Sequence, residues 1–371
     1  MNGDWGKIAR WTVLGALWLA VGAYAVAAAR MVHRHRSELR ITHVDIDIVD
    51  STGHGRLVSS AMVRSWIARS GVKTVGEPAA EVDLRALEHA IGSNGFVDRV
   101  KASVTYAGRI EIRVSQRTPS VRLLFDGYDC YATDDGYVFP APRQSSLYLP
   151  VVTGSYRPPF PSDFSGDTGA LLEEKIAESN ARIAEIDREK YPYYLREREV
   201  ADSMKAVRRM FTSKRMFESR AAFDERVRRL REHKAALRRR YRYRMRVVEE
   251  KIDAVTARQQ AELAAQKKLR KSYEDFHKLI TFVNWIESDD FWRSETVQIV
   301  ASSTPAGELE VELVPRSGRF VVLFGRIGTK EENREKLDRL SEFYRKGLGS
   351  IGWDEYRTIN VKYKGQVVCA K

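Results

Sequence analysis

Side chains that could carry catalysis are scattered along this chain. The seven histidines lie at positions 33, 35, 43, 54, 89, 233 and 277. None belongs to an HExxH motif, and the sequence has no GxSxG, Walker loop or GxGxxG after a predicted strand. No catalytic triad can be assembled from these residues. The sequence therefore predicts a protein without enzymatic activity and without a cofactor.

The two cysteines give no indication of a metal site or a disulfide framework. Cys130 and Cys369 lie far apart, and neither has the CxxC or Cys/His spacing of a zinc site. We predict two single thiols.

Two further stretches resemble ligand-binding loops. "DGYDCYATDDGYVF" is acidic, but it lacks the ligand spacing and terminal glutamate of a calcium loop. Asp134-Asp135-Gly136 within it is typical of a hairpin turn. "VPRSGRFVVLFG" could pass for a phosphate loop, but Gly318 and Gly325 lie where strand-like runs end, which favours turns. No metal ion or small-molecule substrate is predicted.

The charge of the chain is concentrated in one segment. The 371 residues are 43% hydrophobic, enough for two or three domains with their own cores, and carry a net charge of +13. Between Leu171 and Arg270 there are 28 basic and 17 acidic residues, which gives +11 of that total. This segment contains no glycine and a single proline, Pro192, so long helices are predicted.

Apolar residues in the charged segment recur mostly at intervals of three, four or seven, the pattern of a coiled-coil seam. They are Val200, Met204, Val207, Phe211, Phe223, Val227, Leu230, Leu237, Tyr241, Val248, Ile252 and Val255. The pattern predicts an antiparallel hairpin over 165–272 that turns near "FTSKRMF".

The hairpin has three open interpretations. It could be a solvated coiled coil whose arginines keep it soluble, or a docking arm for an acidic partner or anionic lipid head groups. "RRRYRYRMR" places basic residues beside aromatic ones, as nucleic-acid-binding segments do. If the segment is periplasmic, it meets no DNA, and we then expect no nucleic-acid partner.

The N-terminus contains a candidate transmembrane helix. Nineteen uncharged residues, 11–29, span about 28 Å as a helix. "AVA" at 25–27 resembles a signal-peptidase site, but the apolar run continues to Arg30, which favours a retained anchor. Two basic residues precede the helix, and Arg30, Arg34, Arg36 and Arg40 follow it, so charge alone would place the C-terminal part in the cytoplasm.

The next segment, 41–117, has the pattern of a small α+β domain. "ITHVDIDIVD" alternates as a strand, and "SSAMVRSWIARSG" and "EVDLRALEHAIGSNG" predict two helices that end near glycines. "FVDRVKASVTYAGRIEIRVSQRTP" then predicts two strands joined at Ala107-Gly108. The predicted order is strand, helix, helix, strand, strand.

The C-terminus predicts a helix followed by a last strand. Thr329 can cap a helix over 329–348, whose apolar stripe we expect to pack on a sheet. In "INVKYKGQVVCAK", Ile359, Val361 and Tyr363 alternate with polar residues, which predicts a half-buried strand. A last strand at a sheet edge has unpaired backbone groups on its outer side. Lys362 and Lys364 would partly protect that edge.

Several stretches, in order, resemble the bacterial cell-division family FtsQ/DivIB. These are "VSQRTPSVRLL", "YDCYATDDGYVF", "LPVVTG", "FVNWIESDDFWRSETVQIV", "ELEVELVPRSGRFVVLFG" and "TINVKYKGQVV". The resemblance implies an α+β protein with a short cytoplasmic tail (1–10), a transmembrane helix (11–29), a periplasmic POTRA domain (41–117) and a β-domain (118–164 and 273–371). The long insertion at residues 165–272 is a departure from the family pattern.

The resemblance also implies a function. It implies a non-enzymatic inner-membrane scaffold at the division septum, which binds the bitopic proteins FtsB and FtsL and helps to position or regulate the septal synthase FtsW/FtsI. The partner-binding residues would be Tyr363, Lys364, Gly365, Gln366 and Val368. The alternative is a membrane-tethered POTRA protein in transport or outer-membrane assembly, and an enzyme of peptidoglycan metabolism ranks third.

Overall fold

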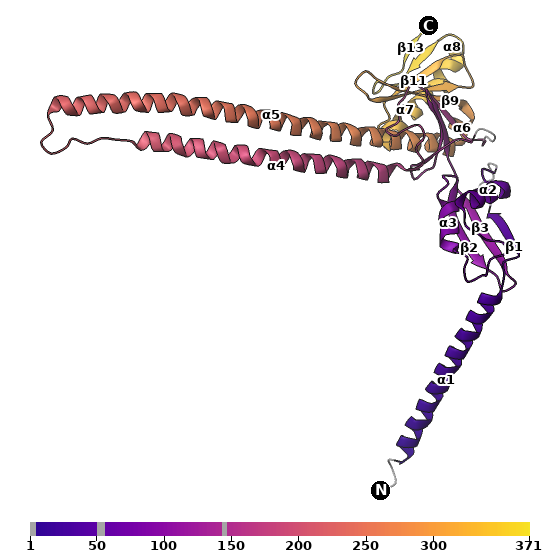
Figure 1. The fold of residues 1–371 in the computed structure, drawn as a ribbon. Coiled ribbons are helices and arrows are strands. Elements are labelled where there is room, and N and C mark those ends of the chain that lie inside the picture. The colour runs from indigo at the N-terminus through magenta and orange to yellow at the C-terminus, as the bar shows by residue number, and fades with distance from the viewer. Residues whose placement is uncertain (1–4, 50–55, 143–146) are drawn as a thin grey trace. The chain divides into compact units, whose positions relative to one another are not determined.

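The computed structural model describes residues 5–49, 56–142 and 147–371, which fold into two compact units (Figure 1). The first unit comprises the N-terminal residues up to Arg157, Pro161–Gly166 and Ile280–Lys371. The second comprises Pro158–Phe160 and Asp167–Leu279. The chain thus leaves the first unit and returns to it after more than a hundred residues.

Helix α1 (Trp5–Glu38) contains the predicted membrane segment. Among the described residues, the stretch Leu14–Val32 is the one helix segment long and apolar enough to cross a bilayer. Its large apolar side chains are exposed, and Leu19 keeps 77% of its surface accessible. Exposure of this kind suits a helix surrounded by lipid rather than by protein.

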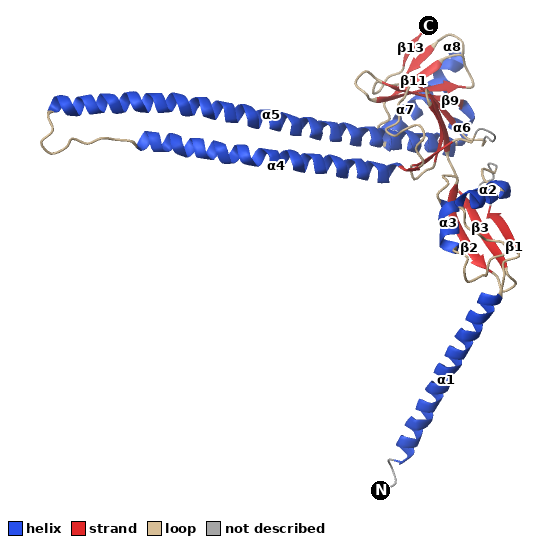
Figure 2. Ribbon diagram, viewed as in Figure 1, coloured by secondary structure: helices blue, strands red, loops and turns tan. Residues whose placement is uncertain are grey.

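A strand–helix–helix–strand–strand unit follows, as predicted. It consists of β1 (His43–Val49), α2 (Ser60–Ser70), α3 (Leu84–Gly92), β2 (Val97–Val104) and β3 (Arg109–Gln116). The sheet order is β1-β3-β2, with β1 parallel and β2 antiparallel to β3. Ser59 caps α2 and Asp83 caps α3, and both helices pack against the sheet (Figure 2).

Turn glycines behave as the sequence predicts. Gly71 ends α2 at φ +72°, and Gly108 turns the β2–β3 hairpin at φ +72°. Gly136 turns the β5–β6 hairpin at φ +84°, where the Thr133 amide donates to the Tyr137 carbonyl.

The β-domain is built on one ten-stranded sheet. Before the insertion come β4 (Val121–Phe125), β5 (Tyr128–Ala132), β6 (Tyr137–Pro140), β7 (Val151–Gly154) and β8 (Gly166–Asp167). After it come α6 (Asp290–Glu295), β9 (Thr296–Ser303), β10 (Leu309–Pro315), β11 (Val321–Gly325), α7 (Lys330–Phe343), a π-helical turn (Tyr344–Leu348), α8 (Gly349–Ile351), β12 (Thr358–Asn360) and β13 (Val368–Ala370). The strand order is β13-β12-β11-β10-β9-β7-β4-β5-β6-β8.

The pairing of β7 with β9 joins the two halves of the β-domain. These strands run parallel, with Gly154 opposite Ala301. Gly154 adopts φ +120°, and a Cβ there would lie 2.1 Å from the Ala301 carbonyl oxygen. Glycine is therefore required where the strand before the insertion meets the strand after it.

An antiparallel hairpin of α4 (Thr168–Arg209) and α5 (Arg220–Ser288) forms most of the second unit, and the last residues of α5, from Ile280, belong to the first (Figure 1). Its polar contacts include Arg182 with Glu262 (2.6 Å) and Gln266 with Asn180 (2.8 Å). At its base, the rings of Phe160 and Phe276 pack edge to face with centroids 5.0 Å apart. The turn at 210–219 contains the predicted stretch "FTSKRMF" (211–217), and α4 runs through Pro192.

Helix α7 carries the predicted cap and apolar stripe. Thr329 and Glu332 form a reciprocal capping box. Leu337, Leu340 and Tyr344 are buried, and Tyr344 packs against the rings of Phe320 and Trp292.

Candidate partner-binding edge

Strand β13 forms one edge of the ten-stranded sheet. It pairs antiparallel with β12, with Thr358 opposite Ala370, Ile359 opposite Cys369 and Asn360 opposite Val368. No further strand follows β13 in the sheet order of the described chain. The outer side of β13 is therefore the place where a partner strand could add.

The direction of the backbone groups follows from the neighbouring ladder. The Val321 amide donates to the Arg357 carbonyl (2.9 Å) and the Val361 amide donates to the Leu323 carbonyl (3.1 Å). The Arg357 carbonyl and the backbone groups of Ile359 and Val361 therefore point toward β11. Because the backbone groups of successive residues in a strand point to opposite neighbours, the amides and carbonyls of Thr358 and Asn360 point toward β13.

Their partners Ala370 and Val368 must then face β12. The Ala370 carbonyl does accept a hydrogen bond from Arg357, at the bend before β12 (2.9 Å). The amide and carbonyl of Cys369, which lies between Val368 and Ala370, point outward. A strand docked on this edge would hydrogen-bond to Cys369.

Side chains of β13 complete the edge. Cys369 is half-buried and lies opposite the fully buried Ile359, and burial raises the pKa of its thiol. Val368 is 44% exposed, on the other face. The edge thus offers a partner one apolar side chain beside free peptide groups.

The turn between β12 and β13 corrects one part of the predicted strand. The alternation predicts that Tyr363 points inward with Ile359 and Val361, but β12 ends at Asn360 and Tyr363 is 54% exposed. The Asn360 side chain accepts a hydrogen bond from the Lys362 amide (2.9 Å), and Gly365 adopts φ +76°. These two residues turn the chain back before the strand can continue.

The five predicted binding residues fall into two places. Tyr363, Lys364, Gly365 and Gln366 lie in or beside the turn and are exposed, and Val368 lies on β13. The fold brings all five residues together at one corner of the sheet. Four of them lie outside a strand, and only Val368 lies on β13.

Lysine side chains beside the turn have different surroundings. Lys362 forms an ion pair with Glu310 on β10 (2.7 Å). Its ammonium group is therefore directed into the domain, and the prediction that it protects the edge of the last strand is wrong. Lys336 of α7 donates to the carbonyls of Phe324 (3.2 Å) and Arg326 (2.7 Å), and burial lowers its pKa.

Arg339 of α7 holds the turn in place. One of its guanidinium nitrogens donates to the carbonyls of Tyr363 (2.5 Å) and Gln366 (3.3 Å). Sequence reasoning missed this residue, because the helix and the turn are brought together only by tertiary packing.

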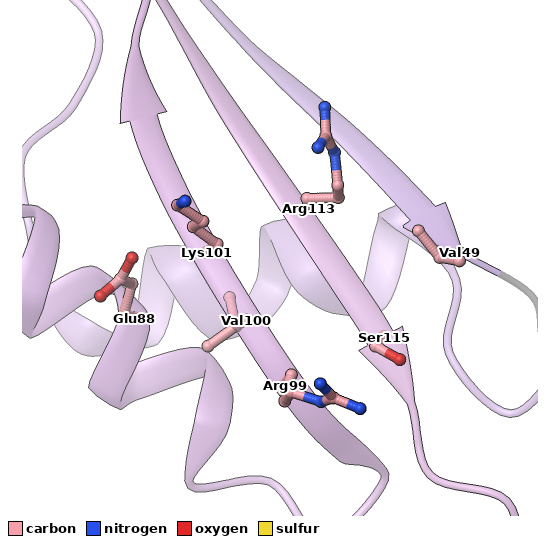
Figure 3. Close-up of a pocket in the computed structure, with 7 residues that line it drawn as sticks. All are labelled: Val49, Glu88, Arg99, Val100, Lys101, Arg113 and Ser115. Atoms are coloured by element: carbon pink, nitrogen blue, oxygen red, sulfur yellow. The ribbon is translucent and has the colours of Figure 1, made fainter.

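A second surface feature lies on the three-stranded sheet. Figure 3 shows basic side chains of β2 and β3 around a depression of about 570 Å³. It is lined by Val49, Glu88, Arg99, Val100, Lys101, Arg113 and Ser115. Three of these side chains have partners in the domain. Arg113 lies 3.7 Å from Asp47, Arg99 donates to Asp98 (3.1 Å), and the Glu88 carboxylate accepts a hydrogen bond from the Ala102 amide (2.7 Å). Glu88 thus protects the outer edge of β2.

Metal-binding side chains do not gather within the described ranges. No group of three or more His, Cys, Asp or Glu there could hold an ion. In the acidic stretch considered for calcium, the hydroxyl of Thr133 hydrogen-bonds to Asp135 and holds the pKa of that carboxyl below its usual value.

Comparisons with known families agree with this architecture. Residues 40–115 match the POTRA-like domain, and residues 232–370 match the family described as FtsQ/DivIB, C-terminal related. The C-terminal part of the chain, from residue 232 in α5 to β13, is thus similar to the FtsQ/DivIB family. The match over the last strands of the sheet favours a cell-division protein over the transport alternative. A comparison with curated proteins gave no match.

The FtsQ/DivIB and POTRA matches leave residues 116–231 uncovered. The uncovered part contains β4 to β8, all of α4, the hairpin turn and the start of α5. The two matches therefore carry no information about the turn of the hairpin.

Proposed function

We propose that this chain is an FtsQ/DivIB-type single-pass inner-membrane scaffold of the division septum, with its N-terminus in the cytoplasm and its domains in the periplasm. It captures FtsB- and FtsL-type partners by strand addition at β13 and, through them, helps to position the FtsW/FtsI synthase. The observation that carries the proposal is the position of β13 at the edge of the sheet, where its register with β12 directs the amide and carbonyl of Cys369 outward.

Backbone pairing supplies only part of the affinity. The amide and carbonyl of Cys369 offer two hydrogen bonds to an added strand, each contributing about 0.5–1.5 kcal/mol. This total corresponds to weak binding, so side-chain contacts must add to it. Tyr363 offers an exposed aromatic ring beside the edge, and Lys364 a free charge for an acidic partner group.

Deletion of residues 365–371 tests the proposal. The shortened chain, purified in detergent, should lose capture of the FtsB/FtsL pair while the remaining sheet still unfolds cooperatively. Full capture by the shortened chain would place the partner site elsewhere.

A reporter fused to the C-terminus tests the orientation. An enzyme that is active only in the periplasm should be active at this position, in spite of the basic residues that follow α1. Activity of a cytoplasm-specific reporter instead would contradict the proposed function as a whole.

A further inference from the structure

The turn of the hairpin, which we call the tip (residues 210–219), exposes apolar side chains to solvent. Phe217 is 99% exposed, Phe211 86% and Met216 85%. Such exposure of two aromatic rings and a methionine in one short loop is unfavourable in water and indicates a binding surface.

The tip is fixed by polar contacts directed toward the hairpin. Arg226 on α5 bonds to Glu218 (2.5 Å), to the Thr212 hydroxyl (3.0 Å) and to the Ser213 carbonyl (3.0 Å). Lys234 donates to the carbonyls of Arg208 (3.1 Å) and Met210 (2.8 Å) at the end of α4. Several polar groups of the loop are thus bonded to the hairpin, while Phe211, Met216 and Phe217 are exposed.

Phe217 has an unusual backbone conformation. Its φ is +67°, and among the described residues it is the one non-glycine residue with a positive φ. A bulky side chain is strained there, and glycine would be favoured for folding alone. The sequence nevertheless places phenylalanine at the most exposed position of the loop.

Basic residues flank the exposed rings in the sequence. Arg208 and Arg209 end α4, Lys214 and Arg215 lie in the tip, and Arg220 begins α5. The acidic residue of the tip, Glu218, is paired with Arg226, and its pKa is lowered by that bond. The charge presented outward is therefore positive.

We propose that the tip inserts into the anionic surface of the bilayer that holds α1. Aromatic and methionine side chains flanked by arginine and lysine are suited to the boundary between anionic head groups and acyl chains. A protein partner that binds a helix or adds a strand would need a regular apolar face or a free strand edge, and the tip is a loop.

The anchor makes this weak contact effective. Three apolar side chains bind a bilayer only weakly by themselves, but a chain already inserted through α1 makes the second contact intramolecular. The inference rests on the membrane anchoring in the proposed function and is independent of partner capture at β13.

Photo-crosslinking identifies what the tip contacts. Phe211 is replaced by p-benzoyl-phenylalanine in the full-length chain, which is reconstituted into liposomes of phosphatidylcholine with or without phosphatidylglycerol. A second liposome population, without protein, contains deuterated lipids, so that adduct masses separate the chain's own bilayer from an apposed one.

We expect lipid adducts from the chain's own bilayer, at least about tenfold more abundant with phosphatidylglycerol than without it. The same photoreactive residue at Tyr194, an exposed position on α4, should give no lipid adduct. Phe217→Gly, which suits the positive φ, should leave unfolding unchanged or improved while it reduces the adducts at position 211.

Three results would overturn the inference. The first is the absence of lipid adducts at position 211. The second is an adduct dominated by deuterated lipid, which would indicate an apposed membrane. The third is a protein adduct in whole cells in place of lipid, which would identify an acidic protein as the occupant. Because partner capture is measured separately, failure here leaves the proposal for β13 standing.

Discussion

Arg339 on α7 donates a hydrogen bond to the backbone carbonyl of Tyr363, 2.5 Å away in the turn before β13. The same nitrogen reaches the carbonyl of Gln366 (3.3 Å). Helix α7 of the β-domain therefore fixes the turn that precedes the edge strand β13. The conformation of that strand thus depends on Arg339, which lies outside it.

Arg339→Ala should weaken capture of the FtsB/FtsL pair without unfolding the domain. The guanidinium bonds are exposed and contribute about 1 kcal/mol, which corresponds to roughly fivefold in Kd. Surface-immobilised full-length chain would report the change. Arg334→Ala, on the same helix and with only a 3.7 Å exposed contact to Asp338, serves as the matched control and should bind normally.

Gly154→Ala should strongly destabilise the β-domain. The added Cβ would meet the Ala301 carbonyl oxygen, and alanine disfavours φ +120°, so we expect a loss of roughly 3 kcal/mol in the free energy of unfolding. Chemical denaturation measures this loss. Gly349→Ala has open space around it and an ordinary helical φ, and should change stability little; equal effects would contradict the account of the β7–β9 junction.

Cys130 should make stability depend on pH in the alkaline range. Burial raises the pKa of its thiol from 9.0 to about 12, so the folded chain keeps a proton that the unfolded chain loses. The buried thiol therefore contributes fully to the free energy of unfolding below pH 9. This contribution is lost as pH rises toward about 12, by at most about 1.4 kcal/mol per pH unit.

Comparison with Cys130→Ala isolates this thiol from the other groups that titrate at high pH. Denaturation at several values above pH 9 should show a steeper decline for the unchanged chain. Parallel curves would show that Cys130 is not buried as described.

Shortening the hairpin should leave partner capture intact. Asn180 and Gln266 hydrogen-bond across the two helices, so a short Gly/Ser loop can replace residues 181–265 without stretching the backbone. The base, with Phe160 against Phe276, is retained. We expect cooperative melting and full FtsB/FtsL capture. Aggregation of the shortened chain would instead show that the hairpin is part of the folding core.

Much of the fold was predictable because its signals are local. Thr329 with Glu332, Gly108 and Gly136 each act within a few residues, and the helical period of the hairpin needs no distant partner. The turn at Tyr363 was mispredicted because the Asn360 side chain and Gly365 override an alternation that suited a strand. Arg339 and the pairing of β7 with β9 depend on contacts across the fold, which a single sequence does not reveal.

The affinity of the Cys369→Pro chain for the FtsB/FtsL pair tests the central claim most directly. Proline removes the outward amide of β13 and is tolerated on the solvent side of an edge strand, so melting should be nearly unchanged. Cys369→Ala, which keeps the amide and loses the thiol, is the matched control. The account predicts capture by the alanine variant and loss of capture by the proline variant. Equal capture by both would contradict strand addition at this edge.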